Sequence, residues 1–285
     1  MNPTLSPNPI EDVRQLLAFP FMVDALLAGT IVAVVAAVVG WYMVLRRQAF
    51  AGHTLAVLAF PGAAGAALAG LPSSLGYYLA CAAGALAMGR ARRFGERGYG
   101  GETAAIGVVQ TFGLAAGFLF LSLSQAVLGG AETLLFGTFL GISRDQVLVL
   151  LVVAAAALGL LALVARPLLF ASVDREVARA NGVPVAVLDA GFLLILALAV
   201  AATSQITGAL LVFALLVAPP ASAQLLTMRP VAGLVLSVCF ALAIVWLGLG
   251  VAYFSVYPVG FYVTTFAFGL YVVLRIGRAA LRRRG

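Results

Sequence analysis

Long apolar segments separated by short loops are the feature that most constrains the fold of this chain. A bilayer core requires about 20 apolar residues per helix, and the 285-residue sequence offers a series of such segments. They are 21–45, 52–70, 73–89, 104–125, 145–165, 187–204, 207–226, 231–254 and 257–275. Only 9% of the residues are charged, against roughly 25% in a soluble domain. The sequence therefore predicts an all-α integral membrane protein, a polytopic bundle of about nine transmembrane helices.

The segment boundaries leave some freedom in this count. Several neighbouring segments are separated only by LPSS or SQITG, so eight to ten spans also fit. The stretch GAETLLFGTFLG, residues 130–141, is too short to cross a bilayer and is interpreted as a re-entrant or interfacial helix. Residues 1–20 are expected to form an arm and a short interfacial helix before a transmembrane domain over 21–277. Residues 278–285 form a basic cytoplasmic tail.

The arginines predict the orientation. Loops on the cytoplasmic side of a membrane carry an excess of basic residues. If the N-terminus lies outside, all of the 17 basic residues except Arg14 and Arg144 fall in inner loops. The alternation holds at every loop, which favours an N-out, C-in arrangement. It also explains the net charge of +7 by topology and lipid headgroups rather than by binding to nucleic acid.

The basic residues also exclude one function class. All of them are arginine, and the sequence contains no lysine. A P-loop of the form GxxxxGK[ST] is therefore absent, so ATP-driven transport would need an ATPase on another chain. Cys81 and Cys239 lie inside apolar runs, where buried thiols are expected rather than a disulfide.

The loop RPLLFASVDREVARANGVPVAVLDA, which starts at residue 166, carries the signals of a short helix. Asp174 and Glu176 suit the positive end of a helix dipole. Asn181 and Gly182 form a C-cap, and Pro184 stops the helix. A short capped helix between two spans on the cytoplasmic side either docks a partner or serves as a surface connector.

Several motifs in the second half of the chain are similar to one transporter family. The run from DREVARANGVP to GALLVFALLVAPPASAQLLT has an acid, an Ala-Arg-Ala and a Gly-x-Pro, then a G-x-L-L-V-x-A-L-L-x-x-P pattern and a Leu-Leu-Thr end. LLFGTFLGIS and YPVGFYVTTFAFGLYVV add a Leu-Phe-Gly segment and a Pro-x-Gly helix entry. In these motifs the chain resembles, from Val44 to Arg275, the membrane permease subunit of the zinc/manganese/iron ABC importer family of the ABC-3 type.

The resemblance implies a type II, vitamin-B12-importer-like permease in a prokaryotic cytoplasmic membrane. Two permeases, as a homodimer or paired with a different permease, would work with two copies of a cytoplasmic ABC ATPase and an extracytoplasmic solute-binding protein. The loop 166–186 would couple permease and ATPase. Its coupling residues would be Asp174, Arg175, Glu176, Arg179, Gly182 and Pro184. This chain would bind no cofactor of its own, because ATP is used by the partner subunit and the metal ion is cargo.

The stretch AFAGHTLAVLAFPGAAG, residues 49–65, both fits this family and departs from it. The family pattern Arg-Arg-x-x-Phe-x-Gly-Asp-x-x-Ser-His-x-x-x-x-Gly is matched at its two arginines, its phenylalanine and its two glycines. His53 stands at the Asp position, Ala56 at the Ser and Val57 at the His. The i, i+4 pair that would face one cation is thus reduced to the only histidine of the chain.

Four polar residues are predicted to line the substrate pathway: His53, Thr54, Gln110 and Gln224. His53 is the candidate metal ligand, because an ionisable group inside a membrane marks a functional site by default. The alternative is a helix-end histidine near the arginine pair. Gln110 and Gln224 are also candidates for interhelical hydrogen bonds. No span carries a carboxylate near its centre, so tight binding of a bare metal ion is not expected.

Three functions follow from these observations. The leading hypothesis is an ABC importer permease for zinc, manganese or iron. The first alternative keeps the machinery and changes the cargo to a chelated metal, siderophore, haem or cobalamin-like solute. The second is an ATP-independent secondary transporter or a membrane-embedded enzyme. The lack of buried acids counts against the second alternative, because ion coupling and catalysis use ionisable groups at depth.

Overall fold

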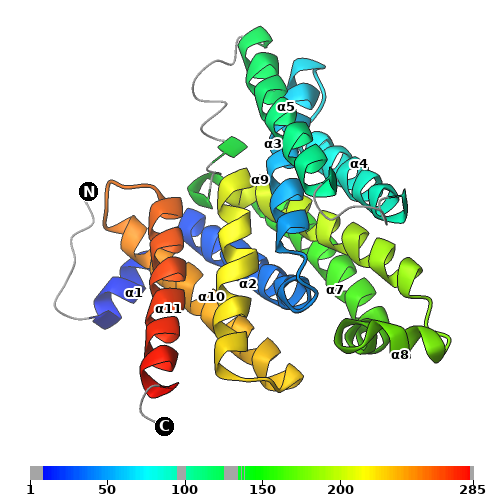
Figure 1. Ribbon diagram of the computed structural model, residues 1–285. Helices are drawn as coiled ribbons and strands as arrows, with labels where there is room; N and C mark the ends of the chain where they lie inside the picture. Colours follow the sequence, from blue (N-terminus) through cyan, green and yellow to red (C-terminus); the bar gives the residue numbers. More distant parts are fainter. Residues whose placement is uncertain (1–8, 95–100, 125–133, 136, 138, 283–285) are drawn as a thin grey trace.

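The computed structural model describes residues 9–94, 101–124, 134, 135, 137 and 139–282 (Figure 1). Within these residues the regular secondary structure is helical, without strands. Among the described residues, seven segments are long and apolar enough to cross a membrane. They are α2 (Pro20–Leu45), α3 (Ala49–Leu68), part of α5 (Gly101–Leu123), α7 (Arg144–Val173), the first part of α9 (Val185–Leu226), α10 (Pro230–Tyr253) and part of α11 (Val259–Arg282). The prediction of an all-α, multi-pass membrane protein is confirmed.

The remaining predicted spans have helical counterparts that are shorter or more polar. The segment 73–89 corresponds to α4 (Ser73–Phe94), and 207–226 corresponds to the second part of α9, which contains the short apolar helix Leu211–Leu226. The described residues also form the short helices α1 (Pro9–Leu17), η1 (Phe139–Gly141), which is a 3-10 helix, and α8 (Arg175–Ala180). Of the predicted re-entrant stretch 130–141, residues 130–133, 136 and 138 lie outside the described residues. So do residues 1–8 of the arm and 283–285 of the tail.

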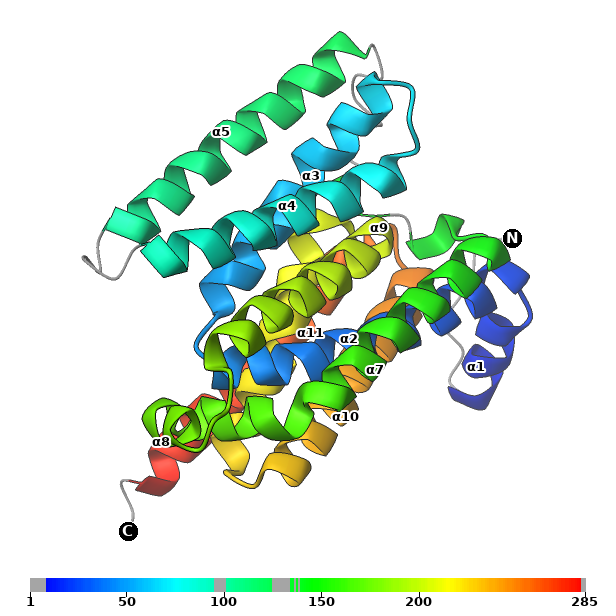
Figure 2. The ribbon, with the colours of Figure 1, turned by 90° about the vertical axis from the view of Figure 1, so that its right-hand side faces the viewer.

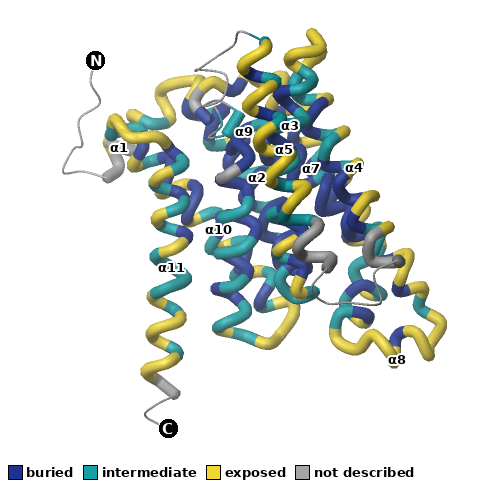
Figure 3. Tube along the Cα trace, turned by 45° about the horizontal axis from the view of Figure 1, so that its top comes forward, coloured by how far each residue is buried: buried dark blue, intermediate teal, exposed yellow. Residues whose placement is uncertain are grey.

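Helix α2 lies at the centre of the bundle. It is apolar around its whole circumference, which is typical of a helix buried on all sides. Its side chains from Met22 to Met43 are largely buried. It packs against α7, α9 and α10 (Figures 1 and 3). A Cβ placed on Gly40 would lie 2.2 Å from the carbonyl oxygen of Leu216, so the backbones of α2 and α9 touch there. Close packing over small residues is typical of helices in lipid.

Helix α9 reverses direction at one residue. Gly208 has φ 75° and ψ 160°, whereas the helix continues through Pro219 and Pro220. The first part runs up from α8 and the second part turns back along α11 (Figures 1 and 2). Gly137, which also has a positive φ of 79°, lies against the backbone at this reversal. A Cβ on Gly208 would lie 2.3 Å from the carbonyl oxygen of Leu135, and one on Gly137 would lie 2.2 Å from that of Ile206.

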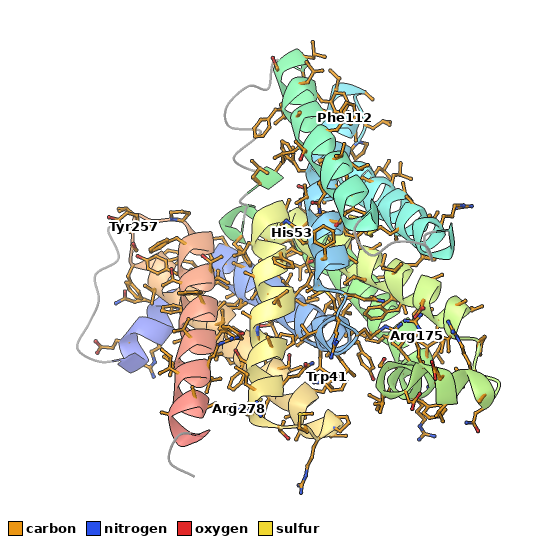
Figure 4. The ribbon with its side chains drawn as sticks, viewed as in Figure 1. Trp41, His53, Phe112, Arg175, Tyr257 and Arg278 are labelled. Carbon is orange, nitrogen blue, oxygen red and sulfur yellow. The ribbon has the colours of Figure 1, made fainter. Side chains whose placement is uncertain are left out.

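Helices α3, α4 and α5 form a group on one side of α9 (Figure 2). Gly62 on α3 and Gly76 on α4 face each other, and a Cβ on either would lie within 2.4 Å of the other's carbonyl oxygen. Helix α5 packs on α3 and leaves large apolar side chains exposed, among them Phe112 (Figure 4). The group therefore presents an apolar outer surface and brings α3 against the second part of α9.

Candidate functional site

Thr54 and Gln110, two of the residues predicted to line a pathway, meet between α3 and α5. Thr54 is buried, and its hydroxyl donates to the carbonyl oxygen of Phe50 at 2.9 Å. The amide nitrogen of Gln110 donates to the same hydroxyl oxygen at 2.7 Å. The predicted interhelical hydrogen bond of Gln110 is present. Such bonds contribute about 0.6 kcal/mol on average to the stability of a membrane protein. This one links α3 to α5 and places polar atoms inside the bundle.

His53 lies next to this pair but faces a different helix. Its ring is half-buried and packs against the ring of Phe213 on the second part of α9, with centroids 4.8 Å apart and planes tilted by 60° (Figure 4). The imidazole makes no hydrogen bond to any described residue. Both ring nitrogens are therefore available to a ligand that enters between α3 and α9. Neutral imidazole is a common ligand of divalent metals.

The helix face of His53 offers little else to a metal. One turn further along α3 come Ala56, which is buried, and Val57, which is half-buried. No group of three or more histidine, cysteine or acidic residues gathers anywhere in the described part of the chain. The site can thus supply one nitrogen ligand, while the side chains of Thr54 and Gln110 are bonded to each other between α3 and α5.

Gln224, the fourth predicted pathway residue, is not part of this cluster. It lies near the end of α9, and its amide nitrogen donates to the carbonyl oxygen of Trp41 at 3.1 Å. Trp41 belongs to α2, so this bond too links two helices. The predicted interhelical role of Gln224 is present, and its side chain is occupied by α2 rather than grouped with His53.

A hollow of about 250 Å³ lies elsewhere, between α4, α7 and α9. Its polar lining residues are Ser74, Tyr78, Asp145, Gln146 and Gln205. The candidate ligand His53 does not line it. Because a divalent metal recognises nitrogen and carboxylate ligands rather than empty volume, and the hollow has one exposed carboxylate, we place the candidate site at His53.

The loop predicted to couple the permease to an ATPase forms the short helix α8. The carboxylate of Asp174 accepts hydrogen bonds from the backbone nitrogens of Glu176 at 3.1 Å and Val177 at 3.0 Å, and thereby caps the helix. At the other end Gly182 has φ 78°, and Val183 donates to the carbonyl oxygen of Ala178 at 3.0 Å. These bonds form a Schellman motif.

Helix α8 stands at the edge of the bundle (Figures 1 and 3). The six residues predicted for coupling are all exposed, and Ala178 is the fully buried member of the helix. They are Asp174, Arg175, Glu176, Arg179, Gly182 and Pro184. One buried methyl and two capped ends hold the helix in place, and its charged side chains are exposed, although Arg175 also pairs with Asp189 on α9.

One charged group at the same end of the bundle as α8 was not among the predicted site residues. Asp189, on the first turns of α9, accepts from Arg46 at the end of α2 and from Arg175 on α8. In the sequence Asp189 resembles an ordinary acid at the end of a span, because its partner Arg46 lies 143 residues away. The sequence signal that points to it is an acid at the start of a span, in a chain that has an arginine pair at the end of another span.

Comparison with known proteins decides the family. A family model described as the ABC 3 transport family matches residues 18–277. The chain belongs to the ABC 3 transport family. A manganese transport system membrane protein of Halalkalibacterium halodurans is 31% identical over 242 residues, which cover 85% of this chain and 81% of that protein. The chelated iron transport system membrane protein YfeC of Yersinia pestis is 30% identical over 248 residues, or 87% of this chain and 82% of that one.

A solved structure has the same arrangement of helices. PsaBC from Streptococcus pneumoniae, in complex with a Fab, superposes with a TM-score of 0.82 at 26% identity. The match covers 94% of this chain and 95% of the other. The predicted resemblance to the metal ABC importer family is confirmed, and the chain is a multi-pass membrane permease subunit.

Proposed function

We propose that this chain is the permease of an ATP-driven importer for a divalent metal ion, namely manganese, iron or zinc. The observation that carries the proposal is the unpartnered imidazole of His53, held against Phe213 where α3 meets the second part of α9. The manganese and chelated-iron transport proteins that are about 30% identical to it support the same cargo class. With a single nitrogen ligand, the site suits brief binding during transit rather than storage.

The importer would be assembled around this chain as follows. Two permeases form the pathway, two cytoplasmic ABC ATPases bind helix α8, and an extracytoplasmic binding protein delivers the metal. Because the sequence has no lysine, the ATPase site belongs to the partner. The arginine distribution supports nine spans with the N-terminus outside and the C-terminus inside, in which α4 and Leu211–Leu226 also cross the membrane.

Import of a chelated metal is the second candidate, and one observation favours it. At the positions where the family pattern places an acid, a serine and a histidine, this chain has His53, Ala56 and Val57. A chelated ion brings its own ligands and needs a neutral pathway, whereas a bare ion finds one protein ligand here in place of the two in the family pattern.

Uptake measurements on the reconstituted complex test the proposal. The permease, its ATPase and its binding protein in proteoliposomes should accumulate radiolabelled manganese, iron or zinc on addition of ATP. His53→Ala should weaken the apparent affinity for the free ion by about tenfold or more, since even residues that only orient metal ligands contribute that much. Thr111→Ala is the matched control: Thr111 is exposed on α5 and bonds to its own helix, so its uptake should equal that of wild type.

A gain-of-ligand variant separates the two cargo classes. Val57→His restores an imidazole at i+4 from His53, so that two nitrogens face one ion. It should strengthen free-ion uptake, and His53→Ala in the same chain should abolish that gain. If free-ion uptake is absent in wild type while a ferric chelate is accumulated, the second candidate holds. Absence of both would contradict metal import altogether.

A further inference from the structure

The carboxylate of Asp189 joins three helices at the inner end of the bundle. One of its oxygens accepts from Arg46, the residue that ends α2, and the other accepts from Arg175, the first residue of α8. Asp189 itself belongs to α9. The two arginines thus approach the same carboxylate from separate elements, and a shift of either one changes the position of the shared acid.

Arg46 is the buried member of this bridge. Its side chain is 3% exposed and that of Asp189 is 14% exposed. Arg46 also donates to the hydroxyl of Ser172 on α7 at 3.0 Å, and its guanidinium lies over the ring of Phe192 at 5.3 Å from the centroid. A buried charge that loses its partner is strongly unfavourable. Arg46 and Asp189 are therefore expected to move together rather than separate.

Arg175 is the accessible member. Its side chain is 52% exposed, and it lies on the helix whose other charged groups face away from the protein. An exposed ion pair contributes little to stability by itself. Here the carboxylate is already held by Arg46, so Arg175 meets an acceptor that is fixed in place.

The turn after Arg46 leads directly to the candidate metal site. Arg47 has φ 56°, Gln48 donates to the carbonyl oxygen of Met43 at 2.9 Å, and α3 starts at the next residue. The turn is a Schellman motif in which an arginine occupies the left-handed position that glycine usually fills. His53 follows about 8 Å along the helix axis, at about 1.5 Å per residue. A turn this short and hydrogen-bonded passes a displacement of Arg46 to the first turns of α3.

We infer that Asp189 is a positioning residue that transmits movement of α8, through the bridge Arg175–Asp189–Arg46, to the α2–α3 turn and the segment that bears His53. This inference rests on the proposed function for the origin of the movement, an ATPase that acts on α8. It assigns the route by which that movement reaches the metal site within one permease.

The test uses the complete complex in proteoliposomes and three variants. Arg175→Gln opens the bridge at its exposed end, and Asp189→Asn replaces the shared acid by an isosteric amide. Arg47→Gln is the matched control, because it removes one arginine from the same turn at an exposed position outside the bridge. Metal uptake per ATP hydrolysed is measured together with the thermal unfolding midpoint. Hydrogen exchange over residues 49–55 is compared with and without vanadate-trapped nucleotide.

The bridge predicts loss of coupling without loss of fold for Arg175→Gln, whereas Asp189→Asn should also lower the unfolding midpoint because it leaves the buried Arg46 without its carboxylate. Arg175→Gln should keep the unfolding midpoint and ATP hydrolysis of wild type, while uptake per ATP falls about fivefold or more, the range of typical coupling between sites. The nucleotide-dependent change in exchange over residues 49–55 should disappear in Arg175→Gln and Asp189→Asn and persist in Arg47→Gln. A chain that carries both Arg175→Gln and Asp189→Asn should show the same uptake per ATP as Asp189→Asn alone, because both changes break one bridge.

Other outcomes overturn the inference or the function separately. If Arg175→Gln and Asp189→Asn keep wild-type uptake per ATP and the exchange change over 49–55, the bridge transmits nothing. The same conclusion follows if they lower the unfolding midpoint and leave that ratio unchanged, because the bridge is then only structural. If wild type accumulates neither metal nor chelate, the proposed function is wrong, and the exchange measurement still decides whether α8 communicates with α3.

Discussion

Gly137 and Gly208 lie where two backbone segments cross in direct contact. Gly208 has a backbone conformation that is accessible essentially to glycine alone. A Cβ on either glycine would lie only 2.2–2.3 Å from a carbonyl oxygen of the other segment. The absence of a side chain at both positions therefore allows the backbone at the reversal of α9 to pack directly on the segment before η1.

Gly208→Ala should destabilise the protein by at least about 2 kcal/mol, because the backbone conformation is strained for alanine and the methyl group overlaps a carbonyl oxygen. The measurement is the thermal unfolding midpoint in detergent. Gly159→Ala is the matched control: Gly159 is exposed on α7 with open space around it. That change should stabilise the helix by about 0.5–1 kcal/mol. Equal midpoints for the two variants would contradict the crossing.

Residue-scale prediction from the sequence succeeded where the signal was local. The histidine within an apolar run and the polar groups of Thr54 and Gln110 were identifiable as residues, and the structure brings these last two within 2.7 Å. Asp189 was not identifiable, since its role depends on Arg46 and Arg175 on two other helices. The contact of His53 with Phe213 was missed for the same reason, because an apolar residue in an apolar span carries no distinguishing pattern.

At the scale of elements, α8 depends on its caps more than on its length. A helix of six residues has almost no interior hydrogen bonds to stabilise it, because the first four N–H groups lack helical acceptors. Asp174 satisfies two of those groups and Gly182 closes the other end.

Asp174→Ala should loosen this helix, whereas Asp174→Asn should retain it, because asparagine caps as well as aspartate while alanine costs about 1 kcal/mol. Hydrogen exchange over residues 175–183 should accelerate about fivefold in the alanine variant and stay near wild type in the asparagine variant. ATP-dependent uptake should fall with the exchange protection. Fast exchange in both variants would mean that the carboxylate charge, rather than the cap, holds the helix.

Element boundaries could be predicted where turn chemistry marks them. The caps around residues 174–184 predicted α8, and SQITG marked the reversal of α9 at Gly208. The end of α7 was placed too early, near residue 165, because Arg166 and Pro167 suggest a loop. In the structure α7 continues to Val173, since proline is tolerated in a helix whose freed backbone groups find other partners.

At the scale of the molecule, exposed apolar surface is the outer layer of the fold. Large apolar side chains are exposed along α5, α7 and α11, for example Phe112 (Figure 4), Leu163 and Phe268. Composition alone predicts that such surfaces face lipid. It does not predict which of them meets a second permease, because lipid tails and a helix partner are equally apolar and packing shape decides between them.

The topology of the whole chain depends on α8. An N-out protein has its C-terminus inside with either seven or nine spans, so the termini do not separate the two. With seven spans, α4 and Leu211–Leu226 do not cross, and α8 lies outside. With nine, it lies inside and can meet an ATPase. Arginines at the ends of the spans favour nine.

Labelling with a membrane-impermeant maleimide distinguishes the seven-span from the nine-span topology. In a Cys239→Ser background, where Cys81 is fully buried, Ala180→Cys at the end of α8 should remain unlabelled in intact cells and react once the membrane is permeabilised. Leu71→Cys is the control: Leu71 is 52% exposed between α3 and α4, and both topologies place it outside, so it should react in intact cells. Labelling of both positions from outside would remove α8 from the ATPase side. That result would contradict the nine-span arrangement and with it the route from α8 to His53.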